Sequence, residues 1–142
     1  MSSNTKPIGV AYEDQNIRGA DVVLSAGQLG YSTAAQGAVT QGAVTQATSK
    51  STGVTLNASS GVITTNAASL ATTIAVSFTL TNSVLTAKSV LAINVASGGT
   101  AAAYLVFVSS MAAGSCVITL VNRSGGDLAE AVVLNYAVIH AE

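Results

Sequence analysis

The sequence predicts an all-β fold: an antiparallel β-sandwich or jelly-roll-like domain that follows an extended N-terminal arm. Three observations support this prediction. Apolar residues alternate with Ser, Thr and Ala at a period of two from Lys50 onward, turn sequences rich in Gly, Asn and Ser separate these runs, and helix-forming residues never continue for long without a glycine or a β-branched residue. Short strands joined by glycine turns are typical of sandwiches and jelly rolls.

The chain divides into an arm, residues 1–49, and a sandwich domain, residues 50–142. The arm holds two short predicted strands, 8–12 and 20–24, followed by two tandem copies of the pentapeptide Gly-Ala-Val-Thr-Gln at 37–46. Two copies are too few for a solenoid. The repeat is either a local duplication in a tolerant loop or an extended segment whose alternating Val and Thr can add as an edge strand to a neighbour.

Each alternating run of the sandwich domain predicts one strand. The run from Ile74 to Leu80 shows the pattern most clearly, because every second residue is large and apolar and the residues between them are Ala, Ser or Thr. Gly98 and Gly99 end one strand and are typical of a hairpin turn. The predicted strands are 52–56, 61–65, 74–80, 89–95, 103–109, 116–122 and 131–139.

Two of these strands, 103–109 and 131–139, are apolar on both faces. Such strands lie between two packed layers or at a subunit interface. The expected core is made of large apolar residues from the predicted strands: Ile74, Val76, Phe78, Leu91, Ile93, Leu105, Phe107, Ile118, Leu120, Leu134 and Tyr136.

The chain carries very few charges: five Lys or Arg and six Asp or Glu among 142 residues, with a net charge of −1. No basic cluster is present to make the phosphate contacts that dominate nucleic-acid affinity, so we expect no nucleic-acid partner. The longest apolar run, 101–108, is far shorter than the roughly 20 residues of a membrane-spanning helix, so we expect no membrane partner. The first residues have no apolar stretch behind basic residues, and we expect no secretory signal.

The sequence offers few groups for chemistry, and we expect no enzyme, no cofactor and no metal site. Asp127 and Glu130 could form a carboxylate pair, but they follow a Gly-Gly turn, which favours solvated turn residues. Cys116 is expected to be a small buried apolar residue rather than a reactive thiol. His140, near the end of the chain, is expected to be exposed. One Cys and one His cannot form a zinc site or a Cys-His catalytic pair within the chain.

Four segments, 45–57, 76–83, 96–100 and 122–131, resemble small virion proteins of tailed bacteriophages and prophages. The resemblance covers about residues 40–142. It implies a β-rich structural protein, most like a head decoration (cement) protein that oligomerises on the outer head surface, binds the major capsid protein and stabilises the shell. The implied location is the exterior of the phage head, after synthesis in the host bacterial cytoplasm.

Two other classes of protein compete with this interpretation. A tail-fibre or other virion receptor-binding module is expected to expose aromatic residues for glycan stacking, whereas the turns here contain mainly Ala, Ser, Gly, Asn and Thr. A secreted Thr-rich surface binder needs export and a long regular Thr array, and the sequence shows neither.

We also expect a closed homo-oligomer, a trimer. Small side chains bury little apolar area per residue, at about 25 cal/mol per Å², so subunit packing is needed to cover the strands that are apolar on both faces. The arm is the expected contact with the capsid, because it combines charges of both signs with large apolar side chains. The expected partner-interface residues are Ile8, Tyr12, Glu13, Asp14, Arg18, Leu24 and Tyr31.

Overall fold

The computed structural model describes residues 41–139, which form strands and loops, and the prediction of an all-β fold is confirmed. No helix in this part of the chain is long and apolar enough to cross a membrane. The strands described are β1 (Gly42–Thr45), β2 (Val54–Thr55), β3 (Ser60–Thr64), β4 (Ala75–Thr81), β5 (Val90–Ser97), β6 (Tyr104–Ala112), β7 (Ser115–Asn122) and β8 (Val133–Ile139).

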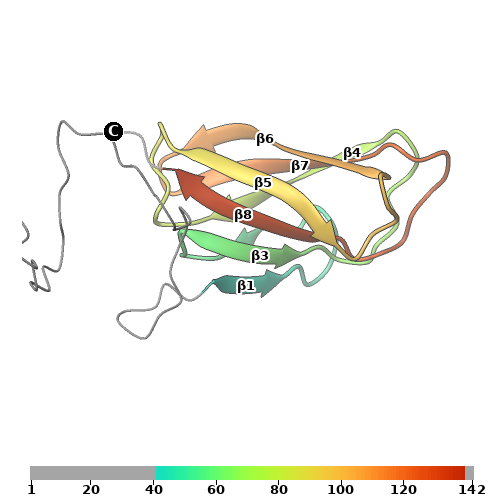
Figure 1. Ribbon diagram of the computed structural model, residues 1–142, viewed down its shortest axis with the longest axis horizontal. Coiled ribbons are helices and arrows are strands. Elements are labelled where there is room, and N and C mark those ends of the chain that lie inside the picture. Colours follow the sequence, from blue (N-terminus) through green and yellow to red (C-terminus); the bar gives the residue numbers. More distant parts are fainter. Residues whose placement is uncertain (1–40, 140–142) are drawn as a thin grey trace, which may run out of the picture. The chain divides into compact units, whose positions relative to one another are not determined.

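The strands form two four-stranded sheets, sheet A in the order β1-β3-β8-β5 and sheet B in the order β2-β4-β7-β6. Figure 1 shows sheet A in front of β4, β6 and β7. β1, at one edge of sheet A, is formed by the second copy of the pentapeptide, within the segment that the sequence assigns to the arm.

The sheets are mixed, whereas the sequence predicts antiparallel pairing throughout. β1 runs parallel to β3, and β2 runs parallel to β4, while the other pairs are antiparallel. The reason is that the first strands alternate between the two sheets. Two reversals separate each strand from the next strand of its own sheet, so these neighbours point the same way.

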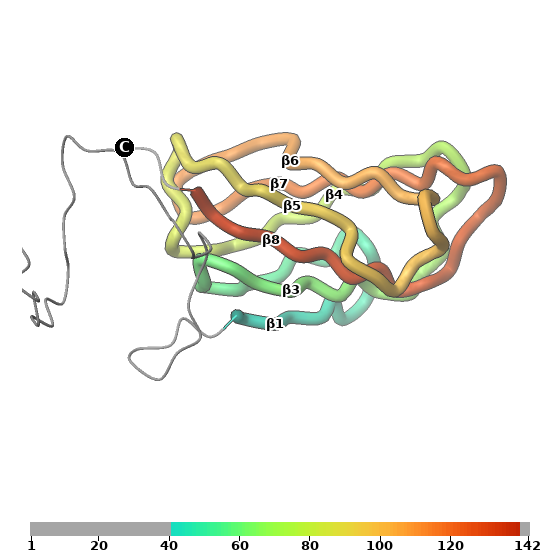
Figure 2. The backbone as a smooth tube through the Cα atoms, viewed as in Figure 1, coloured from blue at the N-terminus to red at the C-terminus, as the bar shows by residue number. Residues whose placement is uncertain are grey.

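Among the described strands, β6 and β7 are the one consecutive pair that lies side by side in a sheet. Gly114 closes this hairpin with a φ of 78°. The hairpin predicted at 97–100 is wrong: Gly98, with a φ of 80°, reverses the chain, but the chain then crosses from β5 in sheet A to β6 in sheet B (Figure 2). A glycine turn signals a reversal and does not tell which sheet the next strand joins.

The core lies between the two sheets, and most of the predicted core residues contribute to it. Val76 and Ile93 are half-buried and pack against its edge. The predicted residues that are buried are Phe78, Leu91, Ile118, Leu120, Leu134 and Tyr136.

Three predicted core residues are wrong, because Ile74, Leu105 and Phe107 are 51%, 48% and 42% exposed. Both faces of β6 are apolar, so its pattern could not tell which set points inward. In the structure Val106 packs against the core with its inward neighbours, and Leu105 and Phe107 point outward. Ile74 lies in the loop just before β4 and outside the strand itself.

Gly61 allows β3 to lie close under a buried aromatic ring. A Cβ atom at this position would lie 2.6 Å from Leu56 Cδ2 and 2.7 Å from Tyr136 Cε1. These distances are well below van der Waals contact, so any side chain at Gly61 would have to displace both neighbours. Gly125, in an open turn, has no atom within 4 Å of the equivalent position.

We predict that Gly61→Ala lowers the free energy of unfolding by about 1–3 kcal/mol, the usual cost of overpacking a core. Gly125→Ala is the matched control and should change it by less than about 0.5 kcal/mol. Urea denaturation of both variants measures the difference. Equal stabilities would contradict the close packing of Tyr136 over β3.

Candidate interaction surfaces

The partner-interface residues predicted from the sequence all belong to the arm. Ile8, Tyr12, Glu13, Asp14, Arg18, Leu24 and Tyr31 lie outside the described residues, as does His140. Their assignment as a capsid contact stays a prediction. The surfaces described below come from the sandwich itself.

Lys50 is buried, with 3% of its surface exposed, at one end of the sandwich. Its Nζ donates hydrogen bonds to the backbone oxygens of Asn66 and Glu130, at 2.5 and 2.6 Å. Burial lowers the pKa of this lysine, and the charge of Glu130 opposes that shift. The Gln46 amide lies beside it, donating to the Lys50 and Thr52 oxygens and accepting from the Asn66 N–H. Lys50 therefore holds three loops together: its own, the loop of Asn66 and the loop of Glu130.

Asp127 and Glu130 each fasten a different loop. Asp127 Oδ1 accepts the N–H of Thr72 at 2.9 Å, and Glu130 accepts the N–H and hydroxyl of Thr100 at 2.6 and 3.1 Å. The Thr100 N–H is the main cause of a lowered Glu130 pKa. Within residues 41–139, no three His, Cys, Asp or Glu side chains come together as a metal site.

Cys116 is buried in the core, which confirms the prediction that it acts as a small apolar residue. Burial raises the pKa of its thiol to about 11, so the reactive thiolate is not formed near neutral pH. The sequence did not show the burial of Lys50, because a single lysine in an uncharged region is typical of a solvated position.

The outer side of sheet B carries an apolar surface that we call the β6 face. It consists of the outward side chains of three adjacent strands. Register places Leu105 beside Val121 and Val121 beside Ala75, and the next row holds Phe107, Thr119 and Ser77. The members of the β6 face are Leu105 and Phe107 of β6, Val117, Thr119 and Val121 of β7, and Ala75, Ser77 and Thr79 of β4.

Two hydroxyl groups of the β6 face, those of Ser77 and Thr119, bond to each other, and Thr119 also bonds to the neighbouring Ser109 of β6. Ser77 Oγ and Thr119 Oγ1 are 2.9 Å apart, and Thr119 Oγ1 donates to Ser109 Oγ at 2.9 Å. Ser109 Oγ in turn donates to the Val117 backbone oxygen at 3.3 Å. Because these groups already have partners within the protein, removing water from this face leaves none of them without a hydrogen bond.

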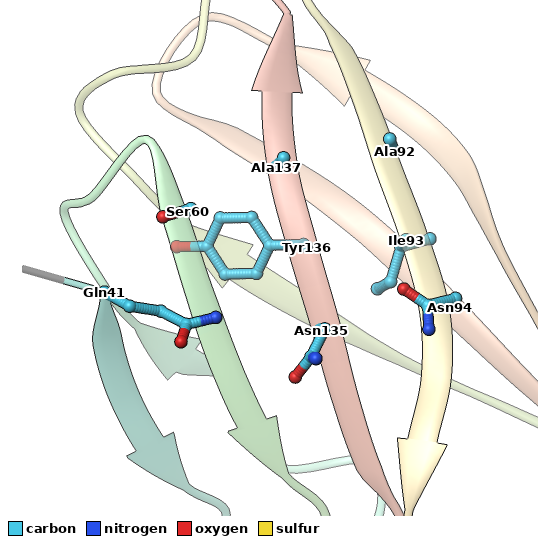
Figure 3. A pocket seen from close by; sticks show the side chains of 8 residues that line it. All are labelled: Gln41, Ser60, Ala92, Ile93, Asn94, Asn135, Tyr136 and Ala137. Atoms are coloured by element: carbon cyan, nitrogen blue, oxygen red, sulfur yellow. The ribbon is translucent and has the colours of Figure 1, made fainter. Parts of the chain in front are cut away.

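The outer side of sheet A carries a shallow depression of about 430 Å³ (Figure 3). Asn94 and Asn135 lie directly opposite each other on β5 and β8, and Gln41 closes the depression at the start of β1. Ala92 and Ala137 form part of its lining. We call this depression the amide trough. Its polar groups are neutral, so it suits hydrogen bonding to an uncharged partner and not acid–base chemistry.

Two exposed apolar side chains stand beside the amide trough. Val90 of β5 and Ile139 of β8 are paired across the two strands and are 57% and 58% exposed. They provide an apolar patch as exposed as Leu105 and Phe107, on the opposite sheet.

Comparison with protein-family models, with curated proteins and with solved structures finds no match to this chain.

We predict that the domain loses stability as the pH rises from about 9 to about 12. Burial raises the pKa of Cys116 to about 11, of Tyr104 to about 12 and of Tyr136 to about 12, above their ordinary values of 9.0, 10.0 and 10.0. The unfolded chain therefore releases these protons first, which favours unfolding in that range and not below it. The lowered pKa of Lys50 has the opposite effect on the pH dependence of stability, but this is one group, whereas three groups have raised pKa values.

Urea midpoints measured at intervals between pH 7 and pH 11.5 test this prediction. Cys116→Ala should start from a lower stability at pH 7 and begin to lose stability at a higher pH than the unaltered protein. A midpoint that is constant from pH 8 to pH 11 would contradict the burial of these groups.

Proposed function

We propose that this chain is a non-enzymatic bacteriophage capsid decoration (cement) protein, which oligomerises on the outer head surface, binds the major capsid protein and stabilises the shell. The observation that carries the proposal is that both outer faces of the sandwich expose apolar side chains and carry almost no charge. Large neutral faces of this kind suit contact with protein surfaces.

The roles of four ionisable side chains support a structural function. Lys50, Asp127 and Glu130 fasten loops, and Cys116 fills the core. A catalytic group needs a free proton-transfer or nucleophilic atom in a cleft, and these four groups are committed elsewhere.

In this proposal the sandwich forms the body of a trimer, and the arm makes the capsid contact. The arm supplies charges of both signs, including Glu13, Asp14 and Arg18, which can pair with opposite charges of the capsid protein. Binding only to the assembled shell stabilises that shell by mass action. Many copies, each binding weakly, add up to a tougher head.

A second candidate is a tail-fibre or other receptor-binding module of the virion, and the amide trough favours it. The side-chain amides of Gln41 and Asn135 make no hydrogen bond within residues 41–139, so both can bind the hydroxyl groups of a glycan. Tyr136 is the aromatic residue among those that line the trough, but only 3% of its surface is exposed, so it offers little ring face for stacking, and we rank this candidate second.

Deletion of residues 2–30 should leave the oligomer folded but prevent it from decorating heads. The arm's charged contacts are lost, while the sandwich keeps its core. Cosedimentation of the protein with undecorated heads of the parent phage measures the binding, and circular dichroism with light scattering checks fold and mass. A full-length companion variant, Glu13→Lys, Asp14→Lys and Arg18→Glu, should weaken binding at least about tenfold.

The control variant replaces the trough amides, as Asn94→Ala and Asn135→Ala, and should bind heads normally. Truncated protein that saturates heads with unchanged affinity would remove the arm from the proposal. Full-length protein that ignores heads but binds tails or cells, and loses that binding in the control variant, would replace decoration by receptor binding.

A further inference from the structure

The relief of the β6 face is uneven across the three strands. Leu105 and Phe107, both on β6, are long side chains that form a ridge at one margin of the face. Ala75, Ser77 and Thr79 of β4 are short and exposed, and they form a shelf at the other side of β7. Two interstrand spacings separate the ridge from the shelf, a distance of about 10 Å.

Ridge and shelf follow the same row spacing. Leu105 shares a row with Ala75, and Phe107 shares the next row with Ser77. Successive rows are about 7 Å apart, because outward side chains recur every second residue of a strand. Suppose that the β6 face of a second copy is turned over onto the first, so that the second copy's β6 lies opposite the first copy's β4. The Leu105–Phe107 ridge of the second copy then packs on Ala75 and Ser77 of the first at two successive rows.

We propose that the β6 face is the surface through which copies of this chain associate, with the Leu105–Phe107 ridge of one copy packed on the Ala75–Ser77–Thr79 shelf of another. This inference rests on the proposed function in one respect, since both require a homo-oligomer. It adds the surface through which the copies associate. Each copy carries one ridge and one shelf, so the contact closes as a pair or as a ring of three around a common axis.

Charge favours a second copy over an unrelated partner. None of the residues of β4, β6 and β7 is charged. About a quarter of the residues of an ordinary globular chain are charged, so most partners would have to bury charges against a face that has no charge to pair with them. The β6 face itself meets the requirement for a neutral, apolar partner.

The contact is made by faces and not by addition of strands. β6 is an edge strand, but its register with β7 shifts between Val108 and Ser110. A bulge of this kind twists an edge and hinders its pairing with another strand. The hydroxyls of Ser77, Thr119 and Ser109 are bonded to one another, so covering them leaves none of these three without a hydrogen bond.

The test is the mass of the full-length protein over a range of concentrations, measured by sedimentation velocity without heads. Leu105→Lys and Phe107→Lys should each weaken self-association at least about tenfold, and the double variant should sediment as a 14.0 kDa monomer. Both positions are exposed, so the fold should persist. Ala75→Arg, which fills the shelf instead of removing the ridge, should dissociate the oligomer as well.

The matched control is Val90→Lys with Ile139→Lys, which places the same charges at equally exposed apolar positions of sheet A and should keep the oligomer intact. Phe107→Cys mixed with Ser77→Cys should form a disulfide between copies under oxidation, since the native Cys116 is buried. A Val90→Cys variant mixed with Ser77→Cys should not.

Three results would overturn the inference: unaltered protein that is monomeric at every concentration, ridge variants that keep the mass of the unaltered protein, or control variants that dissociate. Failure of the proposed function looks different. If the protein forms an oligomer that depends on the ridge but does not bind heads, this inference stands and the proposed decoration function fails. If the protein is a monomer that binds heads, this inference fails and the decoration function stands.

Discussion

The crossing of the chain between the two sheets constrains everything else in this domain. Of the connections between described strands, the β6–β7 hairpin is the one that stays within a sheet, so each sheet is assembled from segments anchored in the other. The core side chains of both sheets share a single interior, which contains Ile63 and Leu134 of sheet A together with Leu80 and Ile118 of sheet B. Neither sheet can bury its apolar side without the other, and we expect the two to form and unfold together.

This constraint determines where the few polar and charged groups lie. Loops that cross between sheets must be fastened at the ends of the sandwich, and buried side chains do this: Lys50 binds two backbone oxygens, Asn82 donates to the Ala58 oxygen, and Asn122 donates to the Leu70 and Gly126 oxygens. With polar chemistry concentrated in the loops, the strands are left with neutral side chains. The outer faces that result suit protein contact, which is the physical basis of both proposals.

Period-two alternation allowed much of the fold to be predicted. It located most strands and most of the core, because one large residue at every second position leaves little choice of inward face, as at Phe78. It failed where both faces of a strand are apolar, at Leu105 and Phe107, since the packing of neighbouring strands decides which face of such a strand points into the core. Parallel pairing of β1 with β3 depends on chain crossings between sheets, and the burial of Lys50 depends on oxygens from distant loops; neither leaves a local pattern. The arm residues proposed for capsid contact were inferred from composition alone.

Amide hydrogen exchange tests the interlocking of the two sheets most directly. Central strands of both sheets, β3 and β8 in sheet A and β4 and β7 in sheet B, should exchange through one opening reaction whose free energy equals that of global unfolding measured with denaturant. Destabilisation by Gly61→Ala, which lies in β3, should then lower protection in β4 and β7 by the same amount. Exchange of one sheet at a lower free energy, while the other stays protected, would contradict the account.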